Sequence, residues 1–219
     1  MKNEVTFVLT SCCRFDLLER TIDSFMKNND YPICEYIMID DGEDKEQHNQ
    51  IKAKYNGQFK LILEGHLGHP ACVDRVYKEV KTEYVFHCQD DWEFENGGGF
   101  IQQSMEILEE YKNIGLVWVR RDDLDHPFEK EIFSTKSGVR FQKPIKGWLY
   151  NNPGYHEDGW FGFTFNPTLR RMSDYEKMKP LAQYISEKRC GWKFRDLGLE
   201  AVVLLKNHVK HIGWNRSKI

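Results

Sequence analysis

The sequence predicts an α/β protein with a mostly parallel central sheet flanked by helices. Short apolar runs rich in Val, Ile and Phe alternate with amphipathic stretches over residues 5–119, and the order strand, helix, strand favours parallel units. The chain has 219 residues, and single domains reach roughly 250 residues before their cores split. Because 40% of the residues are hydrophobic, a substantial core can form. We therefore expect one domain over residues 1–219.

The first elements are bounded by polar loops and cap residues. The apolar run 5–10 predicts a buried strand that ends in the polar loop 11–14. Asp16 can cap a helix in which apolar residues recur at helical spacing as far as Phe25, and the run 35–39 predicts the second strand. The same patterns predict helices at 45–55, 70–81 and 100–111, and strands at 59–63, 84–88 and 115–119.

The remainder of the chain, residues 120–219, is richer in turns and polar residues. No linker rich in Pro, Gly or Ser separates it from residues 1–119, so we interpret the two parts as halves of one domain. In this second half we expect a strand at 160–166, a helix at 175–188, a strand at 201–205 and a basic tail.

The composition disfavours several classes of protein. With 31 basic against 34 acidic residues the net charge is −3, whereas nucleic-acid binding normally needs a basic excess. No run approaches the ~20 apolar residues of a membrane helix and no secretory core opens the chain, so we expect a cytoplasmic protein without a transmembrane segment. Scattered cysteines indicate reduced thiols. The glycine fingerprints of dinucleotide and triphosphate binding are missing.

Acidic pairs follow two of the predicted strands. Asp40 and Asp41 come after the second strand, and Gln89-Asp90-Asp91 follows the fourth. In parallel sheets ligands bind at the carboxyl ends of strands, where both pairs would face one crevice. A divalent Mn²⁺ or Mg²⁺ ion would relieve their repulsion, with substrate phosphates completing its shell. The alternative for Asp40 and Asp41 is that they make a turn or cap the next helix.

These motifs, in this order, resemble those of GT-A glycosyltransferases, close to the family 2 type. The segments that carry the resemblance are Thr10-Ser11-Cys12-Cys13-Arg14, Ile39-Asp40-Asp41-Gly42, Gly65-His66-Leu67-Gly68 and Phe86-His87-Cys88-Gln89-Asp90-Asp91-Trp92-Glu93. The resemblance implies the GT-A fold, a UDP-sugar donor, a hexosyl transfer to a hydroxyl of a glycan or other acceptor, and inversion at the transferred carbon. Residues 1–119 would then bind the donor and residues 120–219 face the acceptor.

The resemblance also implies roles for individual residues. The first loop and the acidic pair after the second strand would hold the nucleoside, and Asp91 would bind the metal. Gln89-Asp90-Asp91 would be a variant of the acidic DxD motif with Gln in first place. Candidate donor-binding residues are Thr10, Ser11, Cys12, Arg14, Asp40, Asp41, Gly68, Arg75, Gln89 and Asp90. Arg75 could equally be a surface cation, and Gly68 would allow the backbone to approach the donor closely.

Transfer to a hydroxyl also requires a base on the face opposite the leaving group. The carboxylates considered are Glu157, Asp158, Asp174, Glu176 and Glu187. The resemblance favours Glu187 because it opens a helix-like stretch beyond the acceptor-side segment, and Asp158 is second because it lies among aromatic residues. For both, a surface ion pair is the alternative.

A histidine at position 211 and three aromatic residues complete the expected site. His211 resembles the late histidine that completes the metal shell in several GT-A enzymes, with a solvated residue in a frayed tail as the alternative. Trp148, Tyr155 and Trp160 could stack on a sugar ring of the acceptor. His66, His69 and Cys72 have a spacing that could hold zinc, but a fourth ligand is missing.

Two further functions stay open at this point. A nucleotidyltransferase of similar layout would need a glycine-rich loop after the first strand, where this chain has Ser11-Cys12-Cys13-Arg14. A noncatalytic sugar-binding module would keep the fold without depending on a metal. The sequence indicates neither the sugar nor the oligomeric state.

Overall fold

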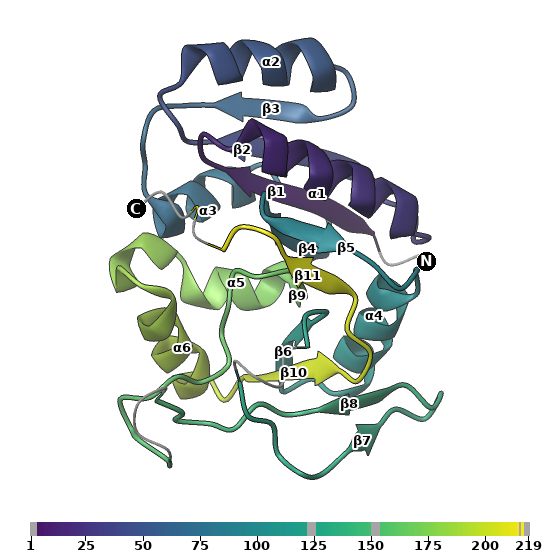
Figure 1. Ribbon diagram of the computed structural model, residues 1–219. Coiled ribbons are helices and arrows are strands. Elements are labelled where there is room, and N and C mark those ends of the chain that lie inside the picture. Colours follow the sequence, from purple (N-terminus) through teal and green to yellow (C-terminus); the bar gives the residue numbers. More distant parts are fainter. Residues whose placement is uncertain (1–3, 122–125, 150–153, 215, 217–219) are drawn as a thin grey trace.

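The structure is a computed structural model that describes residues 4–121, 126–149, 154–214 and 216. Its centre is a nine-stranded sheet with the order β3-β2-β1-β4-β9-β6-β10-β8-β7 (Figure 1). The strands are β1 (Val5–Ser11), β2 (Glu35–Asp40), β3 (Lys60–Leu63), β4 (Tyr84–Gln89), β6 (Ile114–Trp118), β7 (Phe133–Ser134), β8 (Arg140–Gln142), β9 (Thr168–Arg171) and β10 (Glu200–Leu204). The sheet is parallel from β3 to β4 and mixed beyond, because β9 runs antiparallel between β4 and β6.

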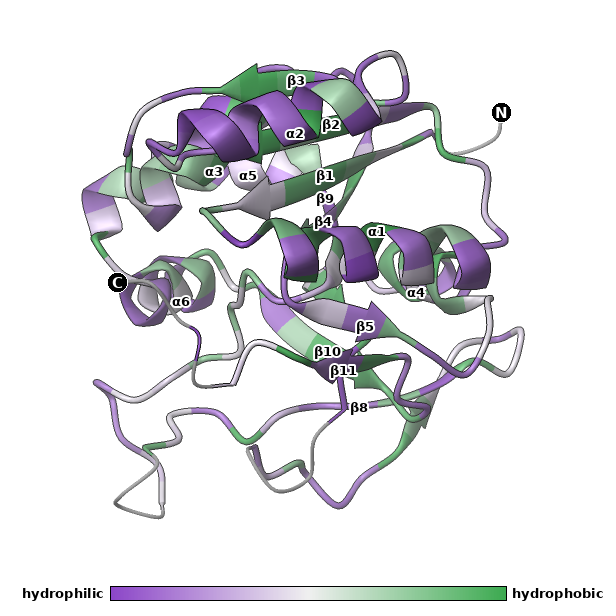
Figure 2. Cartoon of the chain, turned by 45° about the horizontal axis from the view of Figure 1, so that its top comes forward, coloured by the Kyte–Doolittle hydropathy of each residue, from purple (hydrophilic) through white to green (hydrophobic). Residues whose placement is uncertain are grey.

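Helices cover both faces of this sheet. They are α1 (Phe15–Asn28), α2 (Lys45–Tyr55), α3 (His69–Tyr77), α4 (Phe100–Glu110), α5 (Met172–Met178) and α6 (Glu187–Asp196), with a 3-10 turn η1 at Leu181–Tyr184. Side chains alternate across a strand, so Phe7 and Leu9 of β1 join the core under α1, α2 and α4, whereas Val8 joins the core under α3, α5 and α6. Figure 2 shows hydrophobic residues concentrated in the strands and hydrophilic ones covering most of α2.

The expected α/β class is confirmed, and the elements of the first half lie close to their predicted bounds. The helix at 45–55 is α2 as predicted, and the strand at 84–88 is β4 with one more residue. Among the described residues, no helix combines the length and apolar character needed to cross a bilayer.

The second half differs from the expectation in three places. Residues 160–166 are buried in part but irregular, since Gly162 has a φ of +82°, and the strand β9 starts only after Pro167. The helix expected at 175–188 is interrupted: α5 ends before Pro180, and Ser186 caps a new helix by accepting a hydrogen bond from the Arg189 backbone. The basic tail contains a strand.

That late strand is β11 (Val209–His211), which pairs antiparallel with β5 (Trp92–Phe94) in a small second sheet. In Figure 1 the yellow β11 lies beside β5. Neither strand is predicted by the sequence patterns. The pairing matters because β5 directly follows Asp91, so the end of the chain is brought to the acidic motif.

Candidate active site

The carboxyl ends of β1, β2 and β4 form one edge of the sheet. Ser11 lies opposite Asp40, and Thr10 lies opposite Gln89. The loops beyond these strands surround a cavity of about 240 Å³, at the position where open α/β sheets bind ligands. Its lining is Thr10, Ser11, Cys12, Arg14, Asp41, His66, Gly68, His69, Cys72, Gln89, Asp90 and Asp91. All predicted donor-binding residues except Asp40 and Arg75 therefore line one cavity.

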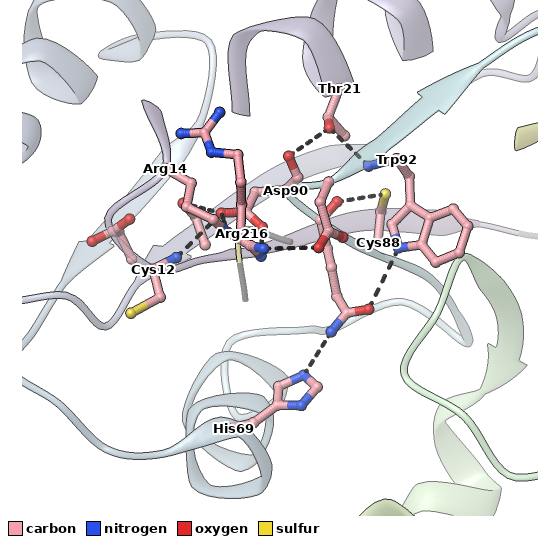
Figure 3. Close-up of polar contacts among 12 residues, drawn as sticks. Cys12, Arg14, Thr21, His69, Cys88, Asp90, Trp92 and Arg216 are labelled. Carbon is pink, nitrogen blue, oxygen red and sulfur yellow. Dashed lines mark hydrogen bonds and ion pairs between the residues drawn. The ribbon is translucent and has the colours of Figure 1, made fainter. Parts of the chain in front are cut away.

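Asp90 anchors the loop that follows β1. Its fully buried carboxylate accepts hydrogen bonds from Ser11 Oγ at 3.0 Å, from the Cys12 backbone nitrogen at 3.3 Å, and from the Arg14 guanidinium (Figure 3). Burial raises the pKa of Asp90 to about 7, against the charge of Arg14, which lowers it. A buried carboxylate that loses its cation is costly. Asp90 and Arg14 thus hold the loop in shape and leave no free carboxylate there.

Asp91 presents its carboxylate differently. Its Oδ2 accepts from Arg14 Nη1 at 2.9 Å and lies 3.2 Å from His211 Nε2. Its Oδ1 is buried and has no hydrogen-bond partner within the described residues. Burial would raise the pKa of Asp91, but the His211 hydrogen bond and the Arg14 charge outweigh it, so the pKa lies below its ordinary value. Asp91 is therefore ionised at neutral pH, with one oxygen unused.

Asp91 and His211 fit a divalent metal ion. An unpaired buried oxygen needs an explanation, and an ionised carboxylate beside an imidazole nitrogen is a common ligand pair. His211 is held by the β5–β11 pairing opposite Trp92, and its ring centroid lies 4.8 Å from that of Trp92. Over the described ranges no group of three His, Cys, Asp or Glu side chains could hold a metal. Further ligands would have to come from the phosphates of a bound substrate or from water.

Gly213 allows this arrangement, and the sequence patterns did not single it out. A Cβ at this position would lie 2.5 Å from Asp91 Oδ2 and 2.7 Å from Asp91 Cβ. We expect Gly213→Ala to displace the carboxylate and to weaken Mn²⁺ binding by at least about tenfold, within the range for residues that orient metal ligands. Isothermal titration with Mn²⁺ measures the effect. Gly191→Ala on α6 is the matched control, since its Cβ would make only ordinary contacts, and equal Mn²⁺ affinity of both variants would contradict the prediction.

The pair after β2 is divided between two roles. Asp40 is fully buried, where it accepts from the Gly42 backbone at 3.1 Å and from Gln47 Nε2 at 2.7 Å, and it lies 3.1 Å from His48 Nε2. It ties the start of α2 to the strand, as in the alternative interpretation. Asp41 lines the cavity. Of this pair, the structure therefore brings only Asp41 to the cavity lining.

The other predicted donor-binding residues differ in whether they line the cavity. Arg75 pairs with Glu64 at 2.8 Å and Glu79 at 2.9 Å, outside the cavity, so it is a surface cation. Gly68, with a φ of +81°, precedes α3 at the cavity wall. Gln89 contacts His69 Nε2 at 3.4 Å (Figure 3). His66, His69 and Cys72 do not form a zinc site, since no three His, Cys, Asp or Glu side chains of the described residues are grouped to hold a metal.

Glu187 begins α6 and lies beside the irregular segment 161–166. Thr164 and Phe165 of that segment lower the pKa of its carboxyl group. The Phe165 ring packs against His69, which lines the cavity, with ring centroids 4.6 Å apart. Burial raises the pKa of Glu187, and Thr164 and Phe165 lower it only in part. A partly buried carboxylate with a raised pKa is suited to accept a proton.

The expected acceptor-side residues lie in two different settings. Trp160 packs against Trp118 and His126, and its Nε1 donates to the Phe163 carbonyl at 2.8 Å. Trp148 forms a β-bridge with Trp160. Tyr155, by contrast, is 65% exposed and lines a surface hollow with Glu157 and Asp158, apart from the donor cavity. Asp158 is thus exposed and is not among the residues that line the cavity at the strand ends.

The remaining carboxylates considered as bases are engaged elsewhere. Asp174 is buried and pairs with Arg171 and Lys177, and Glu176 pairs with Lys179 on the surface. Thr21 was missed by the sequence analysis: its Oγ1 donates to the Asp90 carbonyl at 2.8 Å and accepts from the Trp92 backbone (Figure 3). The sequence did contain a signal for this role: Thr21 is a polar residue on the otherwise apolar, buried face of a predicted helix.

Comparison with known proteins identifies the class. The chain superimposes on the mannosyltransferase PcManGT from Pyrobaculum calidifontis, solved with GDP-Man and Mn²⁺, with a TM-score of 0.68 and 13% identity over 98% of this chain and 58% of that one. It also resembles S. aureus TarS 1-349 in complex with UDP, with a TM-score of 0.57 and 13% identity over 94% of this chain and 59% of that one. The chain thus spans less than two thirds of these neighbours. No curated protein sequence matches it.

The fold, with its cavity at the strand ends, is the GT-A fold. The model of glycosyl transferase family 2 matches residues 6–166, and the chain belongs to that family. The predicted fold and the predicted family are thereby confirmed.

Proposed function

We propose that this protein is a metal-dependent, inverting glycosyltransferase that moves a hexosyl group from a UDP-sugar to a hydroxyl of a glycan or other acceptor. The observation that supports it most is Asp91, which lines the cavity: its Oδ2 lies 3.2 Å from His211 Nε2, and its buried Oδ1 has no hydrogen-bond partner in the described structure. In solved neighbours the same fold carries GDP-Man with Mn²⁺, or UDP.

Asp91 and His211 are the residues that would hold Mn²⁺ or Mg²⁺. When bound, such an ion supplies Lewis-acid neutralisation of the diphosphate leaving group. Arg14 would then be free to exchange its hydrogen bond to Asp91 for a donor phosphate, since it keeps two hydrogen bonds to Asp90. Asp41, Thr10 and Cys12 line the wall where the nucleoside would lie.

Glu187 is the proposed base. It would take the proton of the acceptor hydroxyl as that oxygen bonds to the anomeric carbon and the bond to the diphosphate breaks, so attack from the opposite face inverts the centre. Its position supports this role, because it lies beside the segment that packs on His69 at the cavity. We further propose residues 120–219 as the acceptor-facing half of a single domain over residues 1–219.

A thermal-shift screen tests the donor and the metal together. We expect UDP and UDP-sugars to raise the Tm in Mn²⁺ and to have little effect in EDTA, since a ligand that binds only the native state stabilises it by mass action. GDP and GDP-Man form the comparison arm. A larger shift with GDP would replace the uridine assignment, and a shift by nucleoside triphosphates alone would indicate a nucleotidyltransferase. If no nucleotide changed the Tm, the result would indicate a noncatalytic sugar-binding module.

A further inference from the structure

Gln89 joins two aromatic side chains at the cavity. It is the last residue of β4, and both it and His69, the first residue of α3, line the cavity. The indole Nε1 of Trp92 lies 3.5 Å from Gln89 Oε1, and Gln89 Nε2 lies 3.4 Å from His69 Nε2 (Figure 3). Both contacts are long, so each contributes little binding energy. What they determine is the direction in which the amide faces.

The indole of Trp92 decides the orientation of the Gln89 amide. An indole nitrogen can only donate a hydrogen bond, whereas a primary amide has an acceptor oxygen and a donor NH₂ group. With its oxygen toward Trp92 the amide accepts from the indole, and the reverse orientation would set the NH₂ group against the indole N–H. The NH₂ group of Gln89 therefore faces His69, whose Nε2 must accept its hydrogen bond.

His69 is accordingly a neutral imidazole with its hydrogen on Nδ1, because an acceptor nitrogen carries none. Two features that do not involve Gln89 favour the neutral ring. His69 begins α3, where the positive end of the helix dipole opposes a further positive charge. Burial lowers the pKa of His69, and this outweighs the charges of Asp41 and Asp91, which raise it.

The Nδ1 hydrogen of His69 is left for a ligand. Among the described residues the ring makes no other hydrogen bond, and Nδ1 is not one of their fully buried polar atoms that lack a partner. An edge contact to Phe165, with ring centroids 4.6 Å apart and planes inclined by 62°, holds the ring in place. An uncharged donor held in this way at a cavity wall fits an oxygen acceptor of a ligand.

We propose that Gln89 is a positioning residue that holds His69 as a neutral imidazole with its hydrogen on Nδ1, so that His69 offers the cavity an uncharged N–H donor for an oxygen of the nucleotide-sugar. The Gln in the first place of Gln89-Asp90-Asp91 thereby gains a physical reason. A carboxylate at this position could only accept, so it would draw a hydrogen onto His69 Nε2 and favour the imidazolium. The inference rests on the proposed function in taking the cavity as the donor site.

Nitrogen NMR of protein isotopically labelled in its histidine rings tests the tautomer without any ligand. At neutral pH the parent protein should show an unprotonated Nε2 and a protonated Nδ1, with the His69 signals assigned by their loss in His69→Phe. In Gln89→Glu the Nε2 signal should move to the protonated range. Gln58→Glu is the matched control, since it adds the same charge at an exposed residue that does not line the cavity. A protonated Nε2 in the parent protein overturns the inference, whether or not Gln89→Glu folds.

Calorimetry tests the N–H donor itself. His69→Phe keeps a ring against Phe165 but has no N–H group, whereas His69→Asn keeps an amide N–H close to the position of Nδ1. In Mg²⁺, with the UDP-sugar that gives the largest shift in the screen, we expect His69→Phe to weaken binding by about three- to tenfold, the contribution of one hydrogen bond. His69→Asn should lose less. Equal affinity of His69→Phe and the parent protein overturns the donor role.

Failure of this inference and failure of the proposed function give different results. If UDP-sugars bind but His69 Nε2 is protonated, or His69→Phe binds as tightly as the parent protein, the donor site stands and the inference is wrong. If no nucleotide or nucleotide-sugar binds, the proposed function and the donor role of His69 both fall, and the NMR result decides the tautomer alone.

Discussion

Asp91→Asn is expected to abolish Mn²⁺-dependent nucleotide binding and to leave the fold intact. The substitution keeps the shape of the side chain but removes the charge that faces Arg14 and His211. It also replaces one carboxylate oxygen with an amide nitrogen, which cannot ligate a hard cation. We expect turnover to fall at least about 100-fold, the upper part of the range seen for metal-site substitutions. Titration calorimetry with UDP in Mn²⁺ and in EDTA measures the loss directly.

Asp44→Asn is the control for this substitution. Asp44 caps α2 by accepting from the Glu46 and Gln47 backbones, and Asn is an equally good cap. It removes the same charge without touching the cavity, so its metal response should equal that of the parent protein. A full Mn²⁺-dependent shift in Asp91→Asn would show that the carboxylate at this position does not bind the ion.

The contribution of Asp91 to the pH dependence of stability follows from the ionisation of its carboxylate. The pKa of Asp91 is lowered in the folded protein, so the carboxylate stays charged through the neutral range. Its contribution to stability is present above its unfolded value and is lost as the pH falls through its lowered folded value.

The first half of the chain was predictable because its strands are short apolar runs closed by polar residues. That pattern placed Asp41, Gln89, Asp90 and Asp91 at one edge, and the register confirms their proximity. It could not divide Asp40 from Asp41, since the division depends on Gln47, which reaches back from α2 to capture the Asp40 carboxylate. A contact of this kind produces no periodic pattern in the sequence, so the sequence patterns could not predict it.

The second half was less predictable because its order depends on distant partners. Aromatic residues at alternate positions in 160–166 imitate a strand, but they pack through an irregular segment around Gly162. The strand β11 has only three residues and gains its structure from β5, more than a hundred positions earlier. The role expected of His211 came from family resemblance, and the β5–β11 pairing supplies the physical reason for its position beside Asp91.

Glu187→Gln is expected to have opposite effects on activity and stability. As a general base Glu187 must be ionised, so its removal should lower kcat by about 10²- to 10⁴-fold and spare UDP binding. The exposed ion-paired Glu176 provides the control, and Glu176→Gln should keep the parent rate. If instead Asp158→Asn stops transfer and Glu187→Gln does not, the base lies in the exposed hollow.

The stability effect has a definite sign. The pKa of Glu187 is raised above its ordinary value because burial penalises the charged form. The folded protein therefore binds the proton more tightly than the unfolded chain, and stability falls as the pH rises from the unfolded pKa through the folded one. Gln is neutral at every pH and keeps a carbonyl oxygen that can accept a hydrogen bond. Glu187→Gln should accordingly raise the Tm at neutral pH and show a smaller gain at pH 4, as expected where a site trades stability for function; a Tm lowered equally at both pH values would show that the carboxylate is a structural anchor.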